Sequence, residues 1–196
     1  DGSFLISVYV RESGVVNDRI MVYTRAEDDD TYSRVTVSEL FTPFGGLAYP
    51  ETYPAMCRLS DGNILLIYNV SNGVAGSSVG RLNFRAYIST DDGVTWSLHS
   101  DRLIEDTFSI GTGSGEYTVE GLQIASINGQ VLMLCEVKYG TSGTGVFQNR
   151  LLQFASVDGG QTFTRVTSTY DFDAGFHRVR LSVRQNAFYL VYIAET

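Results

Sequence analysis

The chain has 196 residues, a formal net charge of −8, thirteen arginines and a single lysine, Lys138. An acidic surface of this kind does not bind nucleic-acid phosphates non-specifically, so we expect no nucleic-acid partner. No apolar run approaches the roughly 20 residues that a membrane-spanning helix needs, so we expect no membrane span. Twenty glycines and 12% aromatic residues are typical of a turn-rich all-β protein.

The two cysteines, Cys57 and Cys135, do not have the spacing of a metal-binding pair. We therefore expect two buried, free thiols. Three consecutive aspartates at 28–30 are interpreted as an exposed acidic turn, because calcium needs six to eight oxygens arranged in a loop. The sequence predicts no metal site and no cofactor.

The predicted elements are all strands, and they recur in groups. Residues 1–40 predict the last three strands of a four-strand unit, beginning with the apolar run 4–10. Residues 117–170 predict a complete unit, and residues 176–196 predict the first two strands of another. The clearest unit is residues 50–105, with strands at about 54–60, 63–70, 81–88 and 97–103.

Short turns join the first two strands of each unit. Asp61-Gly62 and Asn128-Gly129 stand between apolar runs, and the segment from Arg180 to Tyr192 has the same organisation. Two-residue hairpin turns need positive φ, which Asn, Asp and Gly tolerate. We therefore predict two-residue turns at these positions.

An acidic position repeats at a fixed interval in the connection between the third and fourth strands. It is occupied by Glu27, Asp91 and Asp158, which are 64 and 67 residues apart. A fixed period indicates repeated supersecondary units that bury their faces against one another. Four antiparallel strands for each period of about 65 residues are typical of a β-propeller blade.

The repeated turn has the residues to satisfy its own backbone. In the segment 89–96, the oxygens of Ser89 and Asp91 can accept backbone N–H groups, and Gly93 can supply a left-handed conformation. We expect Trp96 to fold back as an apolar plug between neighbouring sheets. These positions are predicted to be structural rather than catalytic.

The turn resembles the Asp-box, Ser-x-Asp-x-Gly-x-Thr-Trp, of the sialidase-like superfamily. The first copy matches at every defined position, the second has Phe in place of Trp, and the copy at Glu27 is degenerate. The resemblance implies an all-β chain containing about three blades of a larger six- or seven-bladed propeller. The structural Asp-box residues that it implies are Ser89, Asp91, Gly93, Trp96, Ser156, Asp158, Gly160 and Phe163.

Polar residues stand at the starts of the first strands, where the inner strands of a propeller converge. Alignment of the hairpins places Tyr53, Glu120 and His177 in equivalent positions, and Arg178 follows His177. These groups are predicted to face the axis together, with His177 and Arg178 contacting substrate. The alternative is that they cap strand ends and make local hydrogen bonds.

The opening segment is similar to the first blade of sialidases. That resemblance implies that Arg11 contacts the substrate carboxylate region, that Asp18 is the acid/base, and that Glu120 activates a tyrosine nucleophile, for which Tyr53 is the candidate. The family's arginine at the start of a first strand is absent from this segment, and Cys135 stands where another is expected. The residues present therefore do not form a complete arginine triad.

Three functions are consistent with these residues. We expect a carbohydrate- or partner-recognising propeller module of a larger extracellular, cell-surface or virion protein, without complete catalytic machinery. The first alternative is an exo-sialidase-type glycoside hydrolase that is completed outside this segment. The second is a structural assembly protein whose partial blades pack against further blades or neighbouring subunits.

Overall fold

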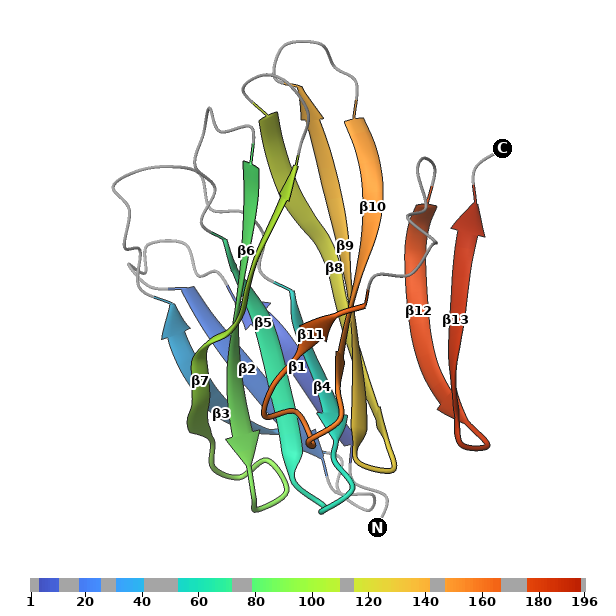
Figure 1. Cartoon of the computed structure of the whole chain (residues 1–196). Helices are drawn as coiled ribbons and strands as arrows, with labels where there is room; N and C mark the ends of the chain where they lie inside the picture. Colours follow the sequence, from blue (N-terminus) through green and yellow to red (C-terminus); the bar gives the residue numbers. More distant parts are fainter. Residues whose placement is uncertain are drawn as a thin grey trace.

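The computed structural model describes an all-β protein. It covers residues 4–10, 18–25, 31–40, 53–71, 79–109, 115–141, 147–166 and 176–194, which form thirteen strands and no helix (Figure 1). Within each sheet, strands that are consecutive in the chain pair antiparallel. The all-β prediction is therefore confirmed. In this described part of the chain, no helix has the length and apolar character needed to cross a bilayer.

The strands form four sheets in chain order, which we call sheets A to D. Sheet A contains β1 (Phe4–Val10), β2 (Asp18–Arg25) and β3 (Ser33–Leu40). Sheet B contains β4 (Pro54–Arg58), β5 (Ile64–Ser71), β6 (Val79–Ser89) and β7 (Ser97–Ser109). Sheet C contains β8 (Gly115–Ile127), β9 (Gln130–Thr141), β10 (Phe147–Ser156) and β11 (Thr164–Arg165). Sheet D contains β12 (Phe176–Arg184) and β13 (Ala187–Ala194).

The four strands predicted for residues 50–105 are present as β4 to β7. Their starts differ from the predicted starts by at most two residues, but β7 continues to Ser109. The described residues form one three-stranded, two four-stranded and one two-stranded antiparallel sheet, which do not close into a barrel or a ring. The propeller architecture therefore stays a prediction.

The hairpin turns differ in length. Asn128 and Gly129 have φ of 49° and 80°, and Gln185 and Asn186 have φ of 50° and 62°. Each of these pairs forms a two-residue turn, because Ile127 pairs with Gln130 in the first hairpin and Arg184 pairs with Ala187 in the second. The prediction of two-residue turns is correct for these two hairpins.

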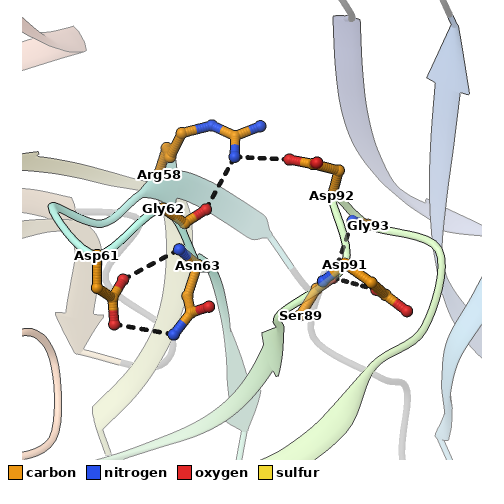
Figure 2. Close-up of polar contacts among 8 residues, drawn as sticks. All are labelled: Arg58, Asp61, Gly62, Asn63, Ser89, Asp91, Asp92 and Gly93. Carbon is orange, nitrogen blue, oxygen red and sulfur yellow. Dashed lines mark hydrogen bonds and ion pairs between the residues drawn. The ribbon is translucent and has the colours of Figure 1, made fainter.

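The hairpin between β4 and β5 is longer than predicted. Gly62 has φ of +90°, and its N–H donates to the Leu59 carbonyl at 3.1 Å, while the Leu59 N–H donates to the Asn63 carbonyl at 2.8 Å. This pattern is a three-residue loop closed by a glycine bulge. The Asp61 carboxylate accepts from the Asn63 N–H at 3.0 Å and stabilises the loop (Figure 2). Compared with the β8–β9 hairpin, the extra residue shifts the residues of β4 by one position relative to their partners in β5.

The sheets stack face to face in chain order (Figure 1). Buried side chains fill the space between sheets A and B, between sheets B and C, and between sheets C and D. The largest of these clusters joins sheets B and C, where the rings of Phe84 and Phe154 meet edge to face with centroids 5.8 Å apart. Each interior sheet is therefore covered on both faces.

Strand β5 illustrates how one strand serves two interfaces. Leu66 and Tyr68 belong to the cluster with sheet A, whereas Leu65 and Ile67 belong to the cluster with sheet C. Successive side chains of a strand point to opposite faces. A strand that is buried on both faces therefore has a continuous apolar run, as β5 has from Ile64 to Tyr68.

The repeated turns also contact the preceding sheet. We call residues 89–96 and 156–163 the box turns. A Cβ on Gly93 would lie 2.9 Å from Leu5 of sheet A, and a Cβ on Gly160 would lie 2.7 Å from Leu65 of sheet B. Both glycines have positive φ, 88° and 90°. Glycine is thus required twice over, by the backbone conformation and by the close approach of the preceding sheet.

The sequon-like tripeptide that begins at Asn69 has a structural role. The Asn69 side chain is buried, and its Oδ1 accepts from the Tyr53 N–H at 2.8 Å. This bond satisfies a backbone donor just before β4 begins. A buried side chain with this bond is not accessible for glycosylation in the folded protein.

The contact between Gly160 and Leu65 yields a stability prediction. Gly160→Ala is expected to destabilise the fold by about 1–2 kcal/mol for a left-handed non-glycine residue and by about 1–3 kcal/mol more for the overlap with Leu65. Gly159→Ala is the matched control, because Gly159 has φ of +72° but has nothing within 4 Å of its added Cβ. Urea denaturation measures both variants. Equal losses would show that the leucine contact contributes nothing.

Candidate functional site

The first box turn is closed by its own side chains. Ser89 is buried, and its Oγ accepts from the Gly93 N–H at 2.8 Å and donates to Asp91 Oδ1 at 2.9 Å. Asp91 then accepts from the N–H and the hydroxyl of Thr95, at 2.8 and 2.5 Å. Figure 2 places Ser89, Asp91 and Gly93 together in this turn.

The second box turn repeats this arrangement. Ser156 Oγ accepts from the Gly160 N–H at 2.8 Å and donates to Asp158 Oδ1 at 2.7 Å. Asp158 accepts from the Thr162 N–H at 2.9 Å and from the Thr162 hydroxyl at 2.5 Å. The degenerate third copy around Glu27 lies outside the described residues.

These hydrogen bonds perturb both aspartates in the same direction. The donors of Thr95 lower the pKa of Asp91, with smaller contributions from Ser89 and the turn backbone. The donors of Thr162 lower the pKa of Asp158 well below its usual range, assisted by Ser156. Hydrogen bonds donated to a carboxylate favour its ionised form. Both carboxylates therefore stabilise the turns in which they lie.

The aromatic residue of each box turn packs toward the preceding sheet. Trp96 is half-buried against the cluster between sheets A and B, and its Nε1 donates to the Gly93 carbonyl at 3.0 Å. Phe163 is half-buried against the cluster between sheets B and C. The predicted plug between neighbouring sheets is thus present, although neither ring is fully buried.

The side chain of Arg58 links the first box turn to the β4–β5 hairpin. Arg58 Nη1 donates to the Gly62 carbonyl at 2.8 Å and to Asp92 Oδ1 at 2.7 Å (Figure 2). Sheet C makes the corresponding link through its backbone, where the Gly159 N–H donates to the Gly129 carbonyl at 3.0 Å. The Arg58–Asp92 pair is exposed, and such pairs contribute about 0–1 kcal/mol.

The predicted catalytic residues occupy different sheets. Asp18 is the first residue of β2, where its backbone pairs with Leu40. Tyr53 stands immediately before β4 and is half-buried against the core of sheets B and C. Glu120 is exposed on β8. The strands β2, β4 and β8 all begin toward the end of the stack that is opposite to the box turns (Figure 1).

The remaining predicted contacts are described only in part. His177 and Arg178 lie in β12, and their side chains are outside the described part of the structure, as is that of Asp18. Arg11 lies wholly outside the described residues. The predicted grouping of Arg11 and the Asp18 side chain with Glu120 and Tyr53 therefore lies outside the described residues.

The strand register corrects the predicted equivalence of Tyr53, Glu120 and His177. Gly121 pairs with Glu136, and His177 pairs with Ile193 at the corresponding position of β13. A bulge falls between Val119 and Gly121, so Glu120 lies at an interruption of the regular ladder between β8 and β9. Bulges re-aim side chains and often border functional sites. Glu120 is therefore displaced by one residue from the position that the hairpin alignment assigned to it.

Glu120 lines a cleft between sheets C and D. The cleft has a volume of about 410 Å³ and is lined by Glu120, Gly121, Leu122, Gln123, Glu136 and Arg180. Two carboxylates, an amide and a guanidinium together supply both donors and acceptors of hydrogen bonds. Of the predicted site residues, Glu120 alone is among the described residues that line it.

Side chains of sheet C hold β12 at the side of this cleft. Gln123 Nε2 donates to the Val179 carbonyl, and Gln123 Oε1 accepts from the Leu181 N–H at 2.6 Å. Glu136 Oε1 accepts from the Val179 N–H at 2.6 Å. The amide of Gln123 thus pairs with β12 as the backbone of a neighbouring strand would.

The sequence patterns did not indicate a role for Gln123 or Glu136. One signal was present, because Glu136 interrupts the apolar run of β9 at the position that Asn69 occupies in β5. Both side chains accept a backbone N–H near the start of a first strand. A polar residue inside an apolar run is informative for this reason.

A second cavity lies among β1, β4 and β8. It has a volume of about 460 Å³, and its lining is mostly apolar, with Ser7, Arg58 and Gln123 as polar members. Cys57 also lines it, and burial raises the pKa of this thiol to about 12. Cys135 is fully buried, and both cysteines are free, as predicted. Thiols of this kind are poor nucleophiles.

Neither a search for metal-binding groups nor comparison with known proteins identifies a function. Within the described ranges, no three His, Cys, Asp or Glu side chains lie close enough together to hold a metal ion. No protein-family model matches the chain, and no curated protein matches its sequence.

The box turns yield a pH prediction. Because the folded-state pKa of Asp158 lies below its unfolded value of about 3.9, its stabilising effect is complete above the unfolded value and is lost as the pH falls from there through the lower folded-state pKa. Asp158→Ala is therefore expected to lower the thermal midpoint at pH 7 and to make its decline in acid shallower. Calorimetry between neutral and acidic pH measures both effects.

The companion variant Thr162→Val retains the carboxylate but removes its hydroxyl donor. It is expected to change stability in the same direction by a smaller amount. A variant of Asp158 that lost ligand binding with an unchanged thermal midpoint would contradict the structural assignment.

Proposed function

We propose that this chain is part of an Asp-box β-propeller that recognises a glycan in the cleft between β8 and β12. The propeller proposal is supported by three features of the sheets: they are antiparallel, they stack in chain order, and their first strands lie near one another. The box turns of sheets B and C have the same hydrogen bonds and contact the preceding sheet in the same way. Repetition of one inter-sheet contact is what a radial arrangement of blades requires.

The composition of the cleft is the observation that carries the glycan proposal. Glu120 and Glu136 offer carboxylate acceptors, and Gln123 and Arg180 offer donors, within one concavity of about 410 Å³. Sugar hydroxyl groups donate and accept at the same time, so a mixed lining suits them. The volume falls in the range of about 300–1,000 Å³ that small-ligand sites occupy.

The position of the cleft also supports recognition. Its residues belong to β8, β9 and β12, and Glu120 stands at a bulge, where a side chain can be redirected without disturbing the core. β12 is held against sheet C by Gln123 and Glu136 on one side of the cleft. A wall held by hydrogen bonds lowers the entropic cost of binding.

Binding without hydrolysis is favoured by the location of Tyr53. This residue precedes β4 in sheet B and packs against the core between sheets B and C, whereas the cleft lies between sheets C and D. A tyrosine nucleophile must contact the base that activates it. We place the protein outside the cell, on a cell surface or on a virion, in line with the family resemblance.

Saturation-transfer NMR with lactose, glucosamine and sialyllactose tests the proposal. At least one of these sugars is expected to bind the purified chain, and Glu120→Gln and Arg180→Gln are each expected to weaken binding about tenfold or more, as loss of a charged hydrogen bond does. Arg58→Gln is the matched control, because Arg58 bonds to Asp92 of the first box turn. Absence of binding by all three sugars would count against the cleft as a glycan site.

The hydrolase alternative has its own test. A fluorogenic sialoside is expected to remain uncleaved by this chain. Turnover that Asp18→Ala abolishes would replace the recognition proposal with a sialidase-type activity, because Asp18 is the residue that the resemblance assigns as acid/base.

A further inference from the structure

The outer face of sheet D carries exposed apolar side chains. Leu190 of β13 packs toward sheet C, so its neighbours Tyr189 and Val191 point to the opposite face. Tyr189 is 45% exposed and Val191 is 63% exposed. Large apolar side chains gathered on one sheet face indicate a surface that another element covers.

The same positions are covered by a neighbouring sheet in sheets B and C. Counted from the hairpins, Tyr189 and Val191 correspond to Leu132 and Leu134 of β9 and to Leu65 and Ile67 of β5. Leu65 and Ile67 pack against sheet C, and Leu132 and Leu134 pack against sheet D. In both cases, the element that covers these positions is the next antiparallel sheet. The outer face of sheet D thus continues an interface that the chain already forms internally.

Sheet A has the complementary exposed face. Leu5 packs toward sheet B, so Ile6 points away from it, and Ile6 is 47% exposed beside the cavity among β1, β4 and β8. Counted from the Asp-Gly turns, Ile6 corresponds to Leu66 of β5. Leu66 is fully buried against sheet A, which is the preceding sheet. Sheet A therefore has the kind of face that receives a preceding sheet, with no such sheet among the described residues.

We propose that a second copy of this chain stacks its sheet A on the outer face of sheet D. The outer face of sheet D corresponds to the faces of sheets B and C that the following sheet covers. The outer face of sheet A corresponds to the face of sheet B that the preceding sheet covers. Their union repeats the arrangement found between sheets A and B and between sheets B and C.

This contact is head to tail, because the two surfaces are different patches of the same chain. Such heterologous contacts form rings when the rotation closes and chains when it does not. The inference is independent of the glycan proposal, since it uses apolar residues on sheet faces. The two proposals can therefore succeed or fail separately.

Sedimentation velocity over a concentration series tests self-association of the 196-residue chain. The wild-type chain is expected to form dimers or larger species as its concentration rises. Val191→Asp and Ile6→Asp are each expected to weaken association about tenfold or more, because a charge would be buried in an apolar contact. Val157→Asp is the matched control, because Val157 is 82% exposed in the second box turn.

Mixing the two interface variants tests the head-to-tail geometry. The Val191→Asp chain retains its sheet A face, and the Ile6→Asp chain retains its sheet D face. Each variant alone is expected to be monomeric, whereas the equimolar mixture is expected to form a dimer that grows no further. Circular dichroism checks that both variants retain the β-sheet spectrum of the wild type. A monomeric wild-type chain, or a mixture that stays monomeric, would overturn the proposal.

Discussion

The packing of each sheet against the sheet before it is the constraint on which the structure depends. Its tightest point is the glycine of a box turn, where a Cβ on Gly160 would lie 2.7 Å from Leu65. The serine and aspartate of the turn hold that glycine in place through hydrogen bonds within the same turn. Local polar chemistry thus fixes the turn, and the turn allows two apolar faces to approach. Stacking in chain order follows, because each interior sheet has apolar residues on both faces.

The box turns hold the sheets together at one end of the stack, which leaves the other end available for polar groups. The box turns occupy one end, and the first strands of sheets B, C and D begin toward the other (Figure 1). Glu120 stands at a bulge in β8, where the regular ladder with β9 is interrupted. Gln123 and Glu136 hydrogen-bond the backbone of β12 and thereby form one side of a cleft. The core supplies stability, and the strand starts supply the chemistry that we propose for recognition.

The two proposals use different parts of this architecture. Glycan recognition uses the polar cleft between sheets C and D, whereas self-association uses the apolar outer faces of sheets A and D. Both follow from the same repeat, which places similar residues at similar positions in successive sheets. Where the ladder of sheet C is interrupted by the bulge at Glu120, a cleft with several polar lining residues is present. Where the repeat continues without a covering sheet, apolar residues remain exposed.

Local interactions are what the sequence by itself determined. The strands, the alternation in β5 and the box turns were predictable, because their hydrogen bonds and periodicities join residues only a few positions apart. The relative register of the first strands was not predictable. A three-residue loop after β4 and a bulge in β8 displaced Glu120 from its predicted equivalence with Tyr53 and His177. The cleft itself depends on contacts such as Gln123 with Leu181, which lie 58 residues apart. Contacts at that separation depend on how whole sheets pack, and only the tertiary structure decides them.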